Sequence, residues 1–168
     1  MKKIIPVLFV LFLIYGFVNQ KEILIPNDAI RFRIIANSDN ENDQQLKFQI
    51  KEAVERELAN QLSNVKNSQE AEKIIENNLE NIKAVINNYT SNYTVSLGLN
   101  YFPEKEYKGV TYPEGNYNSL VITLGNGIGK NWWCVMFPPL CLLEGKNENN
   151  DDINYKFYVK EIIDKYIS

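Results

Sequence analysis

The chain has 168 residues, of which 45% are hydrophobic and 12% aromatic, and it carries a formal net charge of -3. This size and apolar content suit one folded domain and exclude a disordered chain, because buried apolar side chains offset the loss of conformational entropy. Histidine is absent, which excludes Ser-His-Asp and Cys-His nucleophiles and removes the commonest zinc ligand. The lysines are scattered among glutamates, so no basic stripe is present that would favour nucleic acid as a partner.

The first 20 residues predict an export segment. Lys2 and Lys3 precede an almost uninterrupted apolar run over residues 4–18, which is the layout of a signal peptide. A helix of that length rises about 22 Å, which is short of the roughly 30 Å hydrocarbon core of a bilayer. No small-residue cleavage site is evident, so the segment is either a cleaved signal peptide or an uncleaved signal anchor that holds the chain to the membrane. The lysines keep this end cytoplasmic, so we expect the remainder to be exported.

Residues 28–145 are expected to form the main folded domain, which begins with a strand. Apolar and basic side chains alternate from Ile30 to Ile34 and lead into an apolar end at Ile35 and Ala36. This alternation has the period of a strand with one buried face. Arg31 and Arg33 would then lie on the solvated face.

Two amphipathic helices are predicted next. Ser38 and Glu41 have the spacing of a capping box, and apolar residues at intervals of three and four continue to about residue 63. A second stripe of this kind continues to about residue 88, with Asn67 or Ser68 as its cap. The acidic residues near the first cap suit the positive end of a helix better than a calcium loop, because the glycine that such a loop requires is missing.

From Tyr93 onward the period of the pattern changes to two, which predicts strands. The predicted strands cover residues 93–99, 107–112, 117–124 and 132–137. A polar loop and a closing C-terminal helix are expected over residues 146–168. The fold class is therefore α+β, with a mainly antiparallel sheet, two long amphipathic helices packed on one face, and the N-terminal signal or anchor helix.

The glycine-rich segment 125–130 resembles a phosphate loop only superficially. The Walker pattern requires a glycine where Leu124 stands and a serine or threonine where Asn131 stands, and a strand follows instead of a helix. We therefore expect no nucleotide and no other cofactor. The segment is better explained as a hairpin connection that needs positive φ angles.

Cys134 and Cys141 are the only cysteines of the sequence. Pro138 and Pro139 lie between them and force a reversal or a kink that would bring the flanking segments together. In an exported protein the two thiols can form a disulfide. The alternative is two buried thiols in an aromatic core, and in neither case is a metal site expected.

Adjacent tryptophans mark the last predicted strand. In a strand, Trp132 and Trp133 point to opposite faces, so one is exposed unless both faces are covered. An exposed tryptophan beside Phe137 and Pro138 would form an apolar patch suited to a protein or a membrane surface. The alternative is that both rings fill the core.

Three blocks of the sequence together resemble the stage II sporulation protein R family of endospore-forming bacteria. They are IRFRIIANSDNENDQQLK at 30–47, VTYPEG at 110–115 and GIGKNWWCVMFPPLC at 127–141. The resemblance spans roughly residues 28–142.

The resemblance implies a signalling protein, not an enzyme. Such a protein is made in the forespore, exported into the space between the forespore and mother-cell membranes, and sensed by a membrane-embedded aspartic protease of the mother cell. That protease then matures a pro-sigma factor. The resemblance supplies no contact residues, so the partner-binding candidates rest on chemistry alone; they are Trp132, Trp133, Phe137, Pro138, Asn37 and Asp39.

Two other functions stay open from the sequence. One is an exported cell-wall or peptide-processing enzyme that uses aspartate or glutamate, for which no spaced motif is present. The other is a membrane-bound structural protein of the septum.

Overall fold

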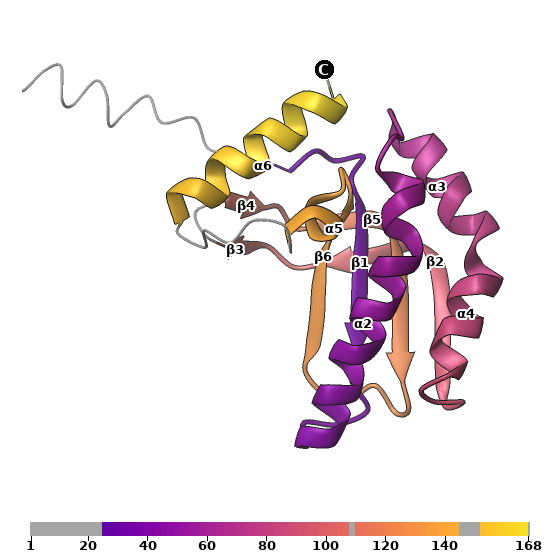
Figure 1. Ribbon diagram of the computed structural model, residues 1–168. Helices are drawn as coiled ribbons and strands as arrows, with labels where there is room; N and C mark the ends of the chain where they lie inside the picture. The colour runs from indigo at the N-terminus through magenta and orange to yellow at the C-terminus, as the bar shows by residue number, and fades with distance from the viewer. Residues whose placement is uncertain (1–24, 108–109, 145–151, 168) are drawn as a thin grey trace, which may run out of the picture.

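The computed structural model describes residues 25–107, 110–144 and 152–167, so the predicted export segment at residues 1–20 lies outside the described residues. A four-stranded sheet lies behind a layer of helices (Figure 1). Its spatial order is β2 (Tyr93–Phe102), β5 (Gly115–Leu124), β1 (Ile30–Ile35) and β6 (Asn131–Phe137). The helices are α2 (Glu41–Leu62), α3 (Ser68–Asn77), α4 (Leu79–Asn87), α5 (Leu140–Glu144) and α6 (Asp152–Ile167). The strands β3 (Lys105–Tyr107) and β4 (Val110–Tyr112) form a separate antiparallel pair, so the single strand predicted over residues 107–112 is wrong.

The α+β class and the mainly antiparallel sheet are confirmed. The pairs β2–β5 and β1–β6 are antiparallel, whereas the central pair β1–β5 is parallel. The expected hairpin between β5 and β6 is wrong, because β1 lies between these two strands.

The glycine-rich connection crosses the end of β1 instead. Gly125 and Gly127 have φ angles of 53° and 63°, which glycine adopts without the steric cost that other residues meet. Asn37, two residues after the end of β1, accepts a hydrogen bond at its Oδ1 from the Asn126 N–H at 2.9 Å. The Gly129 N–H donates to the Ala36 carbonyl at 2.9 Å. The connection is therefore held to the strand that it crosses.

The core lies between the sheet and the helices. Phe32 and Ile34 of β1 point toward α2 and are fully buried, as are Leu120 and Ile122, their partners across the parallel pair. Helix α2 contributes the apolar stripe that the sequence predicts, and its buried hydrophobic members are Ile50, Ala53, Val54, Leu58 and Leu62. Burial of one such side chain stabilises the fold by about 1.5–3 kcal/mol relative to its exposure.

The two helical segments differ from the expectation in detail. The N-cap of α2 is Asn40, not Ser38, because the Asn40 side chain accepts the Asp43 N–H at 2.8 Å. The second predicted helix is divided into α3 and α4 at Asn78. The Asn78 side chain donates to the Ile74 carbonyl at 2.8 Å and to Gln61 Oε1 at 2.7 Å. Asparagine competes with the helical backbone in this way, so the chain changes direction there.

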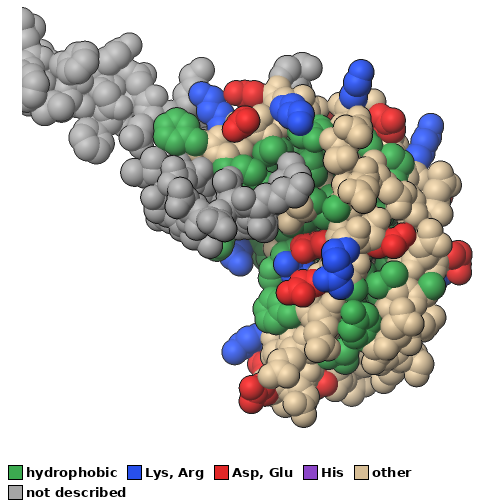
Figure 2. Space-filling model, in the orientation of Figure 1, with side chains coloured by type: hydrophobic (Ala, Val, Ile, Leu, Met, Phe, Trp, Pro, Cys, Tyr) green, Lys and Arg blue, Asp and Glu red, His purple; other side chains and the backbone are tan. Residues whose placement is uncertain are grey.

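Helix α6 packs on the same core as the rest of the domain. Val159, Ile162 and Tyr166 are buried, and the Tyr166 hydroxyl donates to the Ser63 carbonyl just after α2 at 2.7 Å. In the described ranges, no helix combines the length and the apolar character that a membrane span requires. Acidic and basic side chains are interspersed over the face seen in Figure 2.

Candidate functional site

The edge strand β6 carries the two tryptophans on opposite faces. Trp132 lies on the helical face, where its ring meets Phe32 edge-on at 5.7 Å and Lys51 Nζ lies 4.9 Å from its centroid. Trp133 lies on the other face, against Tyr112 at 5.3 Å and Phe102 at 5.9 Å. Both faces of β6 are covered, so each ring is partly buried and partly exposed.

A disulfide joins β6 to α5. It links Cys134 to Cys141, whose Cα atoms lie 5.9 Å apart. Glu55 of α2 lies close to both sulfur atoms, but the disulfide leaves no thiolate to bind a metal ion. Phe137 and Pro138, between the cysteines, are buried. Their side chains are therefore packed inside the domain and do not form the exposed patch that the sequence suggests.

Arg31 is fully buried, contrary to the solvated position that the alternation predicts. Its guanidinium carbon lies 3.5 Å from the Tyr117 ring centroid and 5.3 Å from that of Trp133. Nη2 donates to the Pro113 carbonyl at 2.9 Å, whereas Nε and Nη1 have no hydrogen-bond partner within the described part of the chain. Desolvation by burial lowers the pKa of Arg31.

Arg33 lies two residues further along the same face of β1. Its guanidinium carbon lies 4.0 Å from the Phe102 ring centroid, and its Nη2 donates to the Tyr101 carbonyl at 2.6 Å. Desolvation lowers its pKa as well. No ion pair joins either arginine to a carboxylate of the described residues. The face of the sheet opposite the helices therefore holds two cations that aromatic rings, not acids, surround.

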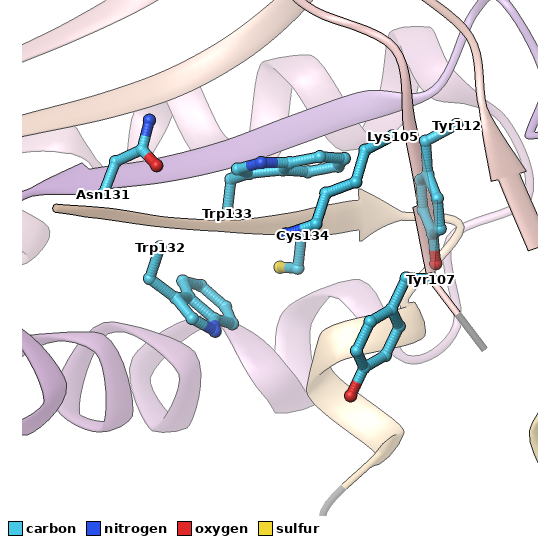
Figure 3. Close-up of a pocket in the computed structure, with 7 residues that line it drawn as sticks. All are labelled: Lys105, Tyr107, Tyr112, Asn131, Trp132, Trp133 and Cys134. Carbon is cyan, nitrogen blue, oxygen red and sulfur yellow. The ribbon is translucent and has the colours of Figure 1, made fainter.

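A cavity of about 280 Å³ lies beside β6. Its walls come from Asn131–Cys134 of β6 and from Lys105, Tyr107 and Tyr112 of the β3–β4 pair (Figure 3). Lys105 is the one charged residue among these seven, and its Nζ lies 5.2 Å from the Trp133 ring centroid. Sequence reasoning missed the β3–β4 residues, because no local pattern indicates that this hairpin lies beside the last strand.

Asn37 and Asp39 lie at the end of β1 and have structural contacts there. Asn37 holds the glycine-rich connection and also donates to Asp43 Oδ2 at 2.8 Å. Asp39 Oδ1 accepts the Lys130 N–H at 2.6 Å. Ser38, Asn37 and Asn40 donate to the Asp43 carboxylate, which lowers the pKa of Asp43 below its ordinary value. Neither Asn37 nor Asp39 lines the cavity at β6.

The fold and the site thus define a small α+β domain that has an aromatic cavity along an edge strand and a disulfide from that strand to the helix that follows it. Residues 26–147 match the family model described as stage II sporulation protein R. The chain therefore belongs to the stage II sporulation protein R family, which confirms the resemblance noted in the sequence and supports a role in sporulation.

A curated relative gives the same family. The chain is 37% identical over 134 residues to stage II sporulation protein R of Bacillus subtilis (strain 168). The match covers 76% of this chain and 60% of the relative, so the chain spans less than two thirds of that protein's length. No solved structure matches the chain.

Proposed function

We propose that this protein is an exported sporulation signal that activates a membrane-embedded aspartic protease by binding to it. Residues 1–20 direct its export from the forespore into the space between the two membranes. They then either stay as a membrane anchor or are cleaved off. There it docks on the mother-cell protease, which then matures a pro-sigma factor. Binding activates the protease because the domain has a higher affinity for the active form than for the inactive one.

The aromatic cavity at β6 is the observation that carries this proposal. Trp132 and Trp133 keep exposed surface beside a cavity, and tryptophan is enriched among the residues that contribute most to binding energy at protein interfaces. Membership of the sporulation family supplies the setting. A secreted ligand requires a docking surface and an export segment, and the sequence predicts the second.

Reconstitution in a non-sporulating cell tests the proposal. The full chain is co-expressed with the membrane protease and the pro-sigma factor of its host, and conversion of the pro-sigma factor is scored on immunoblots. We expect conversion only when the chain is present. A chain lacking residues 1–20 should stay in the cytoplasm and give none.

Two variants connect the result to the site. We expect the double variant that combines Trp132→Ala and Trp133→Ala to reduce conversion at least tenfold. This loss is equivalent to about 1.4 kcal/mol or more of binding energy. The control is Phe157→Ala in α6, whose side chain is 69% exposed and lies outside the cavity lining. Conversion that is indifferent to the chain would refute the proposal.

A further inference from the structure

The cavity lies along the free edge of β6, not on one face of the sheet. Asn131, Trp132, Trp133 and Cys134 are consecutive, and all four line it. Successive side chains of a strand point to opposite faces, as Figure 3 shows for Trp132 and Trp133. A cavity that all four residues line must therefore follow the outer edge of the strand.

The outer edge of β6 is open among the described residues. The strand pairs with β1 on one side, in the register Phe32 with Cys134 and Arg33 with Trp133, and it ends the sheet on the other. Alternate residues of an antiparallel edge strand direct their N–H and C=O groups away from the sheet. These groups are a template for a further strand.

The cavity also favours a negative charge. Lys105 is the one charged residue among the described residues that line it, and the Arg31 guanidinium carbon lies 5.3 Å from the Trp133 ring centroid, with two nitrogen atoms, Nε and Nη1, that have no partner in the described ranges. None of the ion pairs formed by described residues includes Lys105, Arg31 or Arg33. Glu55, whose carboxylate lies close to the Cys134 sulfur, is paired with Lys51 at 3.0 Å. The three cations, which have no ion-pair partner among the described residues, therefore give this edge a positive potential that a carboxylate would complement.

We propose that an extended segment of the partner protein, carrying an acidic side chain, adds as a strand to the free edge of β6. Its backbone pairs with residues 131–134, a span of about 13 Å at the rise of a strand. Its acidic side chain faces Lys105, and the two tryptophan rings flank it on opposite faces. Because this assignment of the binding mode rests on the proposed function, its first test uses a probe that does not require the protease.

The first probe is a synthetic peptide, acetyl-Thr-Val-Glu-Val-Thr-amide, with the Gln peptide as its matched control. Each is titrated to 10 mM into the full chain in detergent, and amide hydrogen exchange is followed by mass spectrometry. We expect the Glu peptide to slow exchange at residues 131–134 and to bind about three to ten times more tightly than the Gln peptide. Exchange along β2, the other edge of the same sheet, should not change. No protection of residues 131–134 at 10 mM, or protection along both edges, would overturn the inference.

A charge reversal tests the acidic occupant. Lys105→Glu, at an exposed position, should remove the preference for the Glu peptide and lower conversion of the pro-sigma factor at least tenfold. Lys73→Glu makes the same change of charge at an exposed position on α3 and should leave both results unchanged. Equal effects of the two variants would refute a specific role of Lys105.

The second probe is the detergent-solubilised protease of the host. A complex should protect residues 131–134, whereas a complex that leaves them exchanging freely would overturn the docking mode. Protection in the free chain at low concentration would assign the edge to a segment of the chain itself, and protection that rises with the concentration of the chain alone would assign it to a second copy. Either result overturns the inference. Peptide binding without pro-sigma conversion in cells would refute the proposed function and still support the edge site.

Discussion

Arg31 is buried and has no acidic partner among the described residues, which is costly for a charged group. Transfer of a cation from water costs several kcal/mol unless other interactions offset it. Here the guanidinium contacts three aromatic rings and makes one backbone hydrogen bond, and cation–π contacts contribute about 0.5–2 kcal/mol each. An apolar residue of the same length would fill this space at lower cost. We therefore expect the charge itself to add little to stability, and in the proposed binding mode it contributes to the positive potential at the edge of β6.

Substitutions at Arg31 separate these two roles. Arg31→Met keeps the volume and removes the desolvated charge, so we expect a free energy of unfolding within about 1 kcal/mol of the wild type. Binding of the Glu peptide should nevertheless weaken. Arg31→Lys keeps the charge but loses the planar stacking, and it should lower the free energy of unfolding by about 1–3 kcal/mol. Urea unfolding of both variants measures the difference, and a Met variant less stable than the Lys variant would contradict this account.

Asp43 makes stability depend on pH in the acid range. The hydrogen bonds from Ser38, Asn37 and Asn40 favour its ionised form and lower its pKa in the folded state. Such a group stabilises the fold above its unfolded pKa of about 3.9, and this contribution is lost as the pH falls through the lowered folded pKa. Asp43→Asn should therefore be less stable than the wild type at pH 7, with a gap that narrows below about pH 4. Thermal unfolding of the wild type and the variant at pH 7 and below about pH 4 measures the difference in stability. A difference that does not change with pH would contradict the link between the Asp43 pKa and stability.

The sequence predicts the aromatic half of the site but not its charged half. Adjacent tryptophans next to a cysteine and two prolines make β6 a candidate site, with burial of both rings in the core as the alternative. Arg31 carries no such signal, because an arginine that alternates with apolar residues has the pattern of a solvated face. Its burial depends on Phe102, Tyr117 and Trp133, which come from distant parts of the chain. Long-range packing of this kind leaves no trace in a local period.

At the scale of elements, the four strands of the sheet could be predicted, but their neighbours could not, and the single strand predicted over residues 107–112 is wrong because β3 and β4 form an antiparallel pair there. A period of two identifies β5 and β6 and says nothing of a third strand between them. One signal was available: Leu120, Val121 and Ile122 of β5 form a continuous apolar run and are all buried, which is typical of a central strand. The division at Asn78 escaped prediction because apolar spacing continues across it. There the side-chain hydrogen bonds, not the pattern, decide the direction of the chain.

The connection that crosses β1 depends on glycine at residue 125. Its φ is 53°, and a Cβ atom there would clash with the Asn37 side chain. Asn37 cannot move freely, because it accepts the Asn126 N–H and donates to Asp43. Gly125→Ala should therefore lower the free energy of unfolding by about 1–3 kcal/mol. Asn126→Ala in the same connection changes an exposed side chain and serves as the control in urea unfolding; equal stability of the two variants would contradict the argument.

The disulfide links α5 to Cys134 in the middle of β6. Mass spectrometry of the intact protein without reductant should show no thiol free for alkylation. Closing so short a loop is expected to contribute about 2 kcal/mol, chiefly by restricting the unfolded chain. Reduction should therefore lower the melting temperature, and the double variant Cys134→Ser with Cys141→Ser should reproduce the loss and stay insensitive to reductant. Full alkylation of both thiols in the native protein would show that the bond is absent.

At the scale of the whole molecule, α6 closes the end of the domain where α2 and β6 terminate. The predicted boundary separates this helix from the main domain, yet its contacts reach residues far back in the chain. The Tyr166 ring lies edge-on to Phe137 at 5.9 Å, and Phe137 is one of the buried residues directly beneath the site. Loss of these contacts would loosen the C-terminal end of β6, whose N-terminal half carries the two tryptophans of the cavity.

Variants of Tyr166 measure how far α6 stabilises the domain. Tyr166→Phe removes only the hydrogen bond to the Ser63 carbonyl and should lower the free energy of unfolding by about 1 kcal/mol. Tyr166→Ala also removes the buried ring and should cost about 3–5 kcal/mol, as large aromatic deletions in cores do. Phe157→Ala deletes an exposed ring of the same helix and should cost less than about 0.5 kcal/mol. A single cooperative transition that shifts in this order would make α6 part of the folding unit, because a separately folding helix would melt without changing the unfolding of the sheet. Equal effects of Tyr166→Ala and Phe157→Ala would instead show that the helix is an appendage and that the sheet and the helices α2 to α4 are stable without it.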